Sequence, residues 1–463
     1  PQTGDRGIRL ADVVNGKNTL EEFTAQLTDY DLSCIIRGEG MGSPKVTAGT
    51  AAAFGGVSDT LTALGIPCAC CDDGPSGMRL DCGTKAFSLP NGTLLASTFD
   101  RPLMTELFTF MGLEMHTNQV DCLLGPGMNI HRHPLNGRNF EYFSEDPYLT
   151  GEMASAELAG LHSTGAEGTI KHFCGNNRET RRHFLDSVIS ERALREIYLR
   201  GFENAVKKGG AKSVMTTYGQ VNGVWTAGNY DLVTGILRDD WGFDGFTMTD
   251  WWANINRRGK APDKSDFAAM AMAQNDVYMV TADGAACNDN TLDSLKSGEL
   301  TRGELQRNAM NILRFLTTTH AMKRVMGCDD ETEIINRPAD AGDVDSTDIE
   351  FHDIDEDLTL DLTGITTEKG SSYAFGLNVS KPGVYKVTLT ASSTLSELAQ
   401  TSVSIFALGS PCGMFTFNGT GGAPVSQTKD VKCLSNFMPI RLYFGGSGLK
   451  TQSIRFELKE RWT

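Results

Sequence analysis

Short apolar runs alternate with longer segments of helical periodicity over the first two thirds of the chain. Continuously apolar runs are typical of strands buried on both faces. Seven of them stand out: Leu32–Ile36, Cys68–Cys71, Cys122–Leu124, Thr169–Phe173, Ser213–Thr217, Phe246–Met248 and Asp276–Val280. A strand and a helix repeated about eight times over roughly 300 residues is the pattern of a (β/α)8 barrel. The sequence therefore predicts an α/β, TIM-like barrel over residues 1–328, with the eighth strand inferred.

The clearest helical segment runs from Ser190 to Lys207. Ser190 can cap it, and the acidic Glu191 opens its first turn. The spacing predicts one continuous helix with a single apolar stripe, formed by Leu194, Ile197, Tyr198 and Phe202.

The composition and the hydrophobic pattern of the chain change after Cys328. Residues 329–362 are acidic and poor in apolar side chains, so we expect a solvated linker there. From residue 363 to 463 the pattern alternates apolar and polar positions, and Lys381-Pro382-Gly383 supplies a turn signal. This part is predicted to be a small antiparallel β-sandwich.

Charge and hydropathy exclude several classes of partner. The net charge is −16, and no basic patch offsets it, so we expect no nucleic acid. No apolar run approaches the roughly 18 residues of a membrane span, so we expect no membrane association. A neutral ligand such as a sugar suits the negative electrostatic potential of this chain better than a polyanion does.

Eleven cysteines occur in the chain, and three crowd one segment at positions 68, 70 and 71. Their spacing is unlike that of a zinc site, and we expect free, largely buried thiols. Free thiols favour a reducing, cytoplasmic compartment. The chain begins at Pro1 rather than at Met, which indicates a processed or truncated N-terminus and leaves secretion open.

Candidate chemistry lies at the ends of the predicted strands, because barrel active sites form at the carboxyl edge of the sheet. The residues there are carboxylates, cations, an imidazole and aromatic rings, which suit a neutral sugar. They carry no metal-ligand spacing and no phosphate-binding loop, so neither a metal nor a cofactor is expected. These candidates are Asp72, Asp73, Asn129–His133, Lys171, His172, Tyr218, Asp250 and Trp251.

Three stretches of the chain resemble the signature of glycoside hydrolase family 3. The first combines Gly125-Pro126-Gly127-Met128-Asn129-Ile130-His131-Arg132 with Gly137-Arg138-Asn139-Phe140-Glu141-Tyr142-Phe143-Ser144-Glu145-Asp146-Pro147. The second contains Lys171-His172-Phe173, followed by Asn176-Asn177-Arg178-Glu179. The third leads from Gly242-Phe243-Asp244-Gly245-Phe246 to Thr249-Asp250-Trp251. Together the motifs cover about residues 65–285, in the order that the family has.

The resemblance implies a role for each matching position. Asp250 corresponds to the nucleophile that forms a glycosyl-enzyme, and Asp73 to a carboxylate that binds sugar hydroxyls. The other residues implied for the first sugar subsite bind hydroxyls or line it: Arg79, Arg138, Lys171, His172, Met215, Tyr218 and Trp251.

Elementary chemistry is consistent with these roles and distinguishes the candidate ligand-binding residues from structural residues close to them in the sequence. We expect the nearby Arg and Lys side chains to lower the pKa of Asp250. Asp72 is the alternative to Asp73. Asp146 is expected to support Arg138 or a helix N-terminus, and His131 and His133 are expected to be structural.

Retaining hydrolysis needs a second carboxyl group as general acid and base. In typical family members it is a Glu on an α/β domain that follows the barrel, whereas here a β-sandwich is predicted. In the subgroup that cleaves N-acetylglucosamine, a His–Asp dyad serves instead, but its positions hold Arg182 and Phe184 here. We therefore expect a permuted family member, whose acid/base Glu lies on a preceding α/β segment or a second chain.

The sequence thus predicts a retaining β-glycosidase that releases glucose from the non-reducing end of β-glucosides or oligosaccharides. A β-xylosidase or another exo-β-glycosidase of the family is the first alternative. A non-catalytic sugar-binding protein is the alternative from another class. Whether the chain forms a homo-oligomer stays open.

Overall fold

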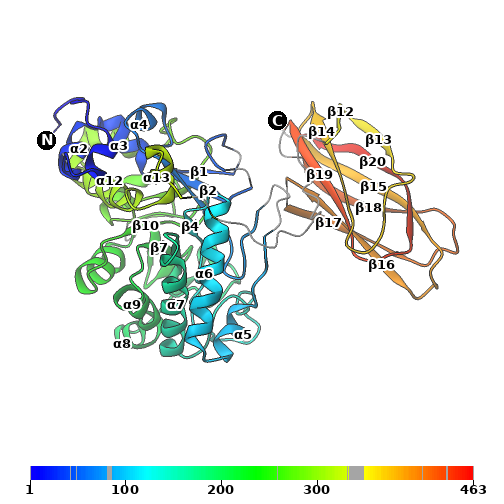
Figure 1. Cartoon of the computed structure of the whole chain (residues 1–463), viewed down its shortest axis with the longest axis horizontal. Helices are drawn as coiled ribbons and strands as arrows, with labels where there is room; N and C mark the ends of the chain where they lie inside the picture. Colours follow the sequence, from blue (N-terminus) through cyan, green and yellow to red (C-terminus); the bar gives the residue numbers. More distant parts are fainter. Residues whose placement is uncertain are drawn as a thin grey trace. The chain divides into compact units, whose positions relative to one another are not determined.

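The chain folds into two compact units, of which one comprises most of residues 2–330 and the other residues 349–461 (Figure 1). This computed structural model describes residues 2–41, 43–47, 49–80, 86–257, 259–330, 332, 349–408, 410–433 and 436–461. In this part of the chain no helix is both long enough and apolar enough to cross a membrane.

The first unit is built around an eight-stranded sheet in the order β10-β7-β5-β4-β3-β2-β1-β11. A bridge between Met248 and Val277 joins its two ends, so the sheet curls into a barrel. Neighbouring strands are parallel except β2, which runs antiparallel to β1 and β3. The strands are β1 (Arg37–Gly40), β2 (Ala52–Gly55), β3 (Cys68–Asp72), β4 (Cys122–Leu123), β5 (Glu167–Phe173), β7 (Ser213–Thr216), β10 (Phe246–Met248) and β11 (Tyr278–Thr281).

This architecture confirms the predicted barrel, but its first strand was wrong. Leu32–Ile36 belongs mostly to the helix α3 (Asp29–Ile35), which Thr28 caps in a reciprocal pair with Asp31. A short apolar run reads alike in a buried strand and in a fully buried helix segment, and α3 is buried from Asp31 to Ile35. The strands that the pattern missed are β1, which starts at Arg37, and the antiparallel β2.

Helices cover the outside of the barrel, and α6, α7 and α9 pack against one another along one side of it (Figure 1). Pro occupies the first turn of α6 and of α7, and an aspartate caps each of them. The α-helices of this unit are α1 (Leu10–Val14), α2 (Leu20–Gln26), α3, α4 (Asp59–Ala63), α5 (Gly92–Ser97), α6 (Arg101–Thr117), α7 (Pro147–His162), α8 (Glu191–Ala193), α9 (Arg200–Lys207), α10 (Phe267–Met272), α11 (Thr291–Ser297), α12 (Arg302–Leu316) and α13 (His320–Met326).

The segment from Ser190 to Lys207 is not one regular helix. Ser190 caps α8 as predicted, but a π-helical stretch at Leu194–Tyr198 separates α8 from α9. The wider turn shifts the register, so Ile197 is 41 % exposed while Leu194 and Phe202 stay buried. The single apolar stripe predicted for this segment was therefore wrong at Ile197.

The second unit is a β-sandwich of two sheets, with strand orders β12-β14-β19-β16-β17 and β13-β20-β15-β18. Its inner faces share one apolar core, and its strand pairs are antiparallel except β12 with β14. The strands are β12 (Phe351–Ile354), β13 (Asp357–Asp361), β14 (Ser372–Val379), β15 (Gly383–Ser393), β16 (Gln400–Ala407), β17 (Ser410–Asn418), β18 (Val425–Cys433), β19 (Phe437–Phe444) and β20 (Leu449–Arg461).

Two of these strands, β12 and β13, lie within residues 329–362, where we expected a linker. Their acidic composition hid an alternating pattern in which Leu358 and Leu360 pack against the sandwich core. Residue 331 and residues 333–348, in the middle of the predicted linker, lie outside the described residues.

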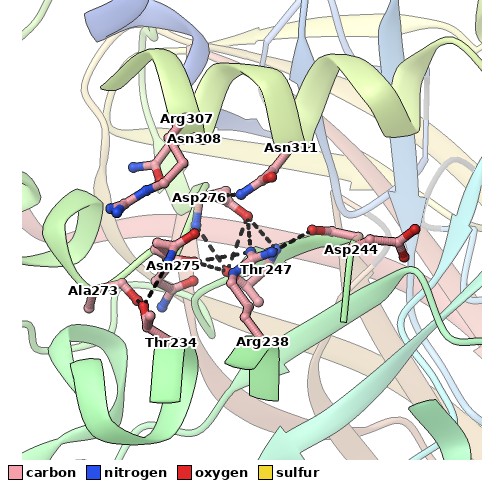
Figure 2. Close-up of polar contacts among 12 residues, drawn as sticks. Thr234, Arg238, Asp244, Thr247, Ala273, Asn275, Asp276, Arg307, Asn308 and Asn311 are labelled. Carbon is pink, nitrogen blue, oxygen red and sulfur yellow. Dashed lines mark hydrogen bonds and ion pairs between the residues drawn. The ribbon is translucent and has the colours of Figure 1, made fainter. Parts of the chain in front are cut away.

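A buried carboxylate network closes the barrel between β10 and β11 (Figure 2). Asp276 is fully buried, and its Oδ2 accepts hydrogen bonds from Arg238 Nη2 (2.7 Å) and the Thr247 backbone (2.9 Å). Asn311 on α12 donates to the other oxygen at 3.1 Å. Burial raises the pKa of Asp276, and Arg238 and the Thr247 amide counteract it.

We predict that Asp276→Ala destabilises the barrel by ~3–5 kcal/mol, because the buried Arg238 would lose its counter-charge. Urea unfolding of the purified chain, followed at the transition of the barrel, measures this. Arg192→Ala removes an exposed pair with Glu196 and should hardly change the transition. Equal urea midpoints for the two variants would contradict the role of the network.

Candidate active site

Side chains carried by four barrel strands, most of them polar, lie at the carboxyl edge of the sheet. Lys171 and His172 are near the end of β5, and Met215 is in β7. Asp73 follows β3 directly, and Asp250 comes two residues after β10. Because parallel strands end at one edge of a barrel, this topology gathers residues that are up to 177 positions apart, from Asp73 to Asp250.

Asp250 is an enclosed carboxylate of this edge, with 7 % of the residue exposed. Its Oδ1 accepts the backbone N–H of Trp251 at 2.8 Å. Its Oδ2 is buried and accepts no hydrogen bond of ordinary length from the described residues; His172 Nε2 lies 3.7 Å away. One oxygen of the carboxylate is therefore held by the backbone, and the other has no hydrogen bond of ordinary length.

The pKa of Asp250 is raised, contrary to our expectation. Burial penalises the charged form and outweighs Arg138, the Trp251 amide, Lys171 and the Tyr218 hydroxyl, which all lower the pKa. The cations act in the expected direction, but the sequence does not reveal how completely the carboxylate is desolvated.

Asp73 and Lys171 form an ion pair at this edge. Lys171 Nζ is almost fully buried and donates to Asp73 Oδ1 at 2.8 Å, while 44 % of the Asp73 side chain is exposed. Burial raises the pKa of Asp73. Lys171, Arg138 and Arg79 together lower this pKa by more than burial raises it, so the pKa of Asp73 lies below its usual value. The pair thus presents an ionised carboxylate and an ammonium side by side.

Asp72 has a different environment from its neighbour. It is fully buried as the last residue of β3, and its Oδ2 accepts the backbone N–H of Arg79 at 3.0 Å. This contact fixes the turn after β3 and favours Asp73 as the member of the pair that faces a ligand.

His172 is oriented by a chain of hydrogen bonds behind the site. Asn176 Nδ2 donates to the Tyr142 hydroxyl (3.2 Å), and His172 Nδ1 lies 3.2 Å from this hydroxyl and 3.3 Å from Asn129 Oδ1. The other ring nitrogen, Nε2, faces Asp250. Asn129 clamps the backbone of His172 from both sides, at 2.9 Å each. Burial, then Arg138 and Lys171, hold the pKa of His172 well below its usual value, so the ring is neutral.

Arg138 brings a second cation to Asp250 and is fixed from behind. Its Nε donates to Glu141, and its guanidinium lies 5.9 Å from the centre of the Tyr142 ring. Tyr142 and the adjacent Glu141 belong to the motif around Arg138, yet sequence reasoning did not single them out. The sequence signal that could have identified Glu141 and Tyr142 is their position three and four residues after Arg138, a candidate ligand-binding arginine.

Tyr218 lies under a loop that follows β5. Arg182 stands 4.6 Å from the centre of its ring, and the His183 ring is 4.0 Å away. Arg182 is in turn held by Glu179 at 2.9 Å. Arg182 and Asn176 are thus further residues of this region that the sequence analysis did not predict for the site.

The two remaining predicted residues contribute apolar surface. Met215 is buried in β7, and Trp251 is partly buried and packs against the barrel core. The next residue, Trp252, is 55 % exposed and has a left-handed backbone, with φ of 55°. The more accessible aromatic ring after Asp250 is therefore Trp252.

The residues expected to be structural are so. Asp146 caps α7 by accepting the N–H groups of Tyr148 (2.7 Å) and Leu149 (3.2 Å). His131 Nε2 contacts the carbonyl oxygens of Asn139 and Tyr142, and His133 accepts the N–H of Leu135.

Among the residues that the structure describes, one group could hold a metal ion, namely His116, His320 and Asp329. The two imidazole rings stack 3.8 Å apart with 26° between their planes, so their lone pairs do not converge on one point. Arg324 also lies 3.5 Å from Asp329. His320 bonds the carbonyl of Thr164, which precedes β5, so the group lies away from the edge that carries Lys171. We assign it a structural role.

A family model described as the glycosyl hydrolase family 3 N terminal domain matches residues 6–315. The chain is 62 % identical to a beta-glucosidase of Ruminococcus albus over 99 % of this chain and 50 % of that protein. It is 36 % identical to beta-glucosidase A of Butyrivibrio fibrisolvens over 70 % of this chain and 36 % of that protein. The chain therefore spans half or less of the length of these relatives.

Solved structures of other proteins are also similar to the chain. A beta-glucosidase from Paenibacillus barengoltzii is 46 % identical, with a TM-score of 0.69, over 98 % of this chain and 49 % of that one. Beta-glucosidase 3B from Thermotoga neapolitana, solved in complex with α-D-glucose, is 36 % identical, with a TM-score of 0.60, over 68 % of this chain and 44 % of that one.

We predict that His172 stays neutral while His162 becomes charged as the pH falls. Burial lowers the pKa of His162, but Glu167, whose carboxylate lies 3.0 Å away, raises it more through its contact and its charge together, so His162 protonates above its usual value of 6.5. For His172 burial and three cations, Arg138, Lys171 and Arg182, act in the same downward direction. Imidazole ¹⁵N spectra from pH 8 to 5, assigned with His162→Gln and His172→Gln, should show His162 titrating first and His172 remaining neutral. A His172 ring that charges before His162 would refute this description of the site.

Proposed function

The chain belongs to glycosyl hydrolase family 3, and on that premise we propose that it carries the glycone site and the nucleophile of a retaining β-glucosidase. The relatives named as beta-glucosidases support the substrate class. The half-length match means that the activity of the whole protein is part of the proposal.

The observation that carries the proposal is the state of Asp250. A carboxylate that is buried, hydrogen-bonded through one oxygen and unbonded at the other is suited to attack an electrophilic carbon. Arg138 and Lys171 add positive charge around it without bonding the second oxygen. In the proposed reaction this oxygen bonds the anomeric carbon as the aglycone oxygen leaves, and water later releases the sugar.

The ion pair of Asp73 and Lys171 supplies the specificity in this proposal. An ionised carboxylate can accept hydrogen bonds from two hydroxyl groups at once, and the ammonium can donate a hydrogen bond to a third oxygen. With the neutral imidazole of His172 and the guanidinium of Arg79, the edge offers both donors and acceptors to a sugar ring. Glucose fits this set, and so would another sugar with equatorial hydroxyls.

The raised pKa of Asp250 has a consequence for pH dependence. The nucleophile must be ionised, so kcat/KM should fall as the pH decreases through its pKa. Because burial raises that pKa, we expect this acid limb above the ordinary aspartate value of 3.8.

No carboxyl group stands out as the general acid among the residues that the structure describes. The carboxylates described near Asp250 are already bound, since Glu141 holds Arg138, Glu179 holds Arg182 and Asp73 holds Lys171. We therefore propose that a Glu outside these residues protonates the leaving group, on an α/β segment that precedes the barrel or on a second chain.

We predict that Asp250→Asn reduces kcat by roughly 10³-fold or more while the fold survives, because the amide cannot form the glycosyl-enzyme. Hydrolysis of an activated aryl β-glucoside measures the loss. Trapping with a 2-fluoro glucoside should label the wild-type peptide that contains Asp250, as seen by mass spectrometry.

The matched control is Asp244→Asn, which changes an exposed aspartate shortly before the same strand and should leave both readouts intact. An Asp250→Asn variant that keeps a tenth of the wild-type rate would eliminate Asp250 as nucleophile. Absence of label with full hydrolysis would eliminate the retaining mechanism.

We further predict that the 463-residue chain by itself is slow on cellobiose but reacts with a dinitrophenyl glucoside. A sugar leaving group needs a proton and a dinitrophenolate does not, and a general acid typically contributes about 10²–10⁴-fold. The ratio of kcat/KM for the two substrates tests this. Rapid cellobiose cleavage by the purified chain, lost in Asp250→Asn, would place the acid among its own residues.

A further inference from the structure

Two cysteines far apart in sequence meet beside the barrel. Cys34 belongs to α3, and Cys287 lies in the segment between β11 and α11. Their sulfur atoms are 3.8 Å apart, and the two thiols are positioned to hydrogen-bond. The sulfurs are therefore non-bonded neighbours, and a disulfide would require them to approach to about 2.05 Å.

The surroundings of Cys287 stabilise a thiolate. Arg37 Nη1 donates to its sulfur at 3.2 Å, and Ser33 Oγ lies 3.1 Å from it. The pKa of Cys287 is lowered, first by the hydrogen bond from Cys34, then by Ser33 and Arg37, against burial and the charge of Asp289. The pKa of Cys34 is raised, because its proton is shared with Cys287 and because it is buried. These contacts therefore favour a thiolate on Cys287 and a protonated thiol on Cys34.

The arginine that activates Cys287 is itself fixed. Arg37 is 1 % exposed, and its Nε donates to Asp289 at 2.7 Å. The same segment is held by the Tyr30 hydroxyl, which donates to the carbonyl of Ala285 at 3.0 Å, and by Glu39, which accepts the N–H of Gly284 at 2.9 Å. The contact between the two sulfurs thus rests on bonds from α3 and β1 that do not involve the sulfurs.

The backbone at Cys287 is strained, with φ of 51° in the left-handed region that non-glycine residues rarely adopt. Cys287 is also only partly buried, so a small oxidant can reach it. A strained, accessible cysteine that faces a buried partner differs from a cysteine that simply fills a core.

From this geometry we propose that Cys34 and Cys287 form a reversible, peroxide-driven disulfide, with Cys287 as the attacking thiolate and Cys34 as the resolving thiol. The bond would tie α3 to the segment that leaves β11 at the edge of the barrel that carries Asp250. This site is independent of the proposed glycosidase function.

The chemistry balances in two steps. The Cys287 thiolate attacks one oxygen of hydrogen peroxide, the O–O bond breaks, and the leaving hydroxide takes a proton to become water, which leaves a sulfenic acid. The sulfur of Cys34 then attacks the sulfenic sulfur, the S–O bond breaks, and a second water leaves with the thiol proton. Two thiols are oxidised to one disulfide, and one peroxide is reduced to two waters.

Other described cysteines provide contrasts. Cys71 and Cys122 are neighbours in β3 and β4 but fully buried, and burial raises the pKa of Cys122 well above its usual value. Cys328 is exposed, so it serves as the reference for accessibility alone.

The test is peptide mapping of the purified chain after a short exposure to equimolar hydrogen peroxide, followed by alkylation. We expect a cross-linked pair of peptides containing Cys34 and Cys287, abolished by dithiothreitol. In Cys34→Ser, Cys287 should instead accumulate a sulfenic acid that dimedone traps. In Cys287→Ser, Cys34 should remain a free thiol. Cys328→Ser should behave as the wild type.

Iodoacetamide alkylation of the untreated wild type at pH 7 provides a readout that needs no variant. We expect Cys287 to be alkylated at least several-fold faster than the more exposed Cys328, because the thiolate is the reactive form. Slower alkylation of Cys287 than of Cys328, or peroxide treatment that leaves the Cys34 and Cys287 peptides unlinked, would overturn the proposal.

Discussion

The buried carboxylate of Asp276 joins the last two strands of the barrel, and the geometry of the candidate site depends on that junction. The strands β10 and β11 share little regular ladder, and the Thr247–Asp276 contacts replace it. Just beyond, the Thr249 side chain accepts the N–H of Met279, and Trp252 donates to the Met279 carbonyl. The segment that carries Asp250 is therefore bonded to β11 on both sides of the nucleophile, so closing the barrel also fixes the direction in which the carboxylate points.

The same strand links the site to its surroundings. After Thr281, β11 leads into the segment that Tyr30, Glu39 and Arg37 hold against α3 and β1. A second set of supports lies behind His172, where Asn129 and Tyr142 fix the ring without reaching the ligand side. Side chains that would contact a substrate are thus positioned by buried hydrogen bonds from neighbours, which is how a site can be preorganised before a ligand binds.

Much of this arrangement could be predicted from the sequence, but not all of it. Six of the seven apolar runs are strands, and the polar residues after them gather at one edge, because a parallel barrel brings strand ends together. Leu32–Ile36 was misread because burial on all sides removes the helical period from so short a stretch. The antiparallel β2 and the acidic edge strand β13 escaped because pairing partners are decided by tertiary contacts. The role of Tyr142 depends on a contact across 30 residues, which no local pattern encodes.

The pKa of Asp250 connects these structural constraints to the proposed chemistry. Its charge is surrounded by Arg138 and Lys171, yet burial prevails and the anion is less stable than it would be in water. A bound sugar would exclude still more water, which raises the cost of the charge and at the same time strengthens the attraction of the cations. Forming the glycosyl ester removes the charge and with it the desolvation penalty. In the proposed mechanism the burial that makes Asp250 harder to ionise therefore also favours its attack once it is ionised. Arg138 and Lys171 limit how far burial can raise the pKa of Asp250, and so keep the carboxylate ionised enough to act as the nucleophile.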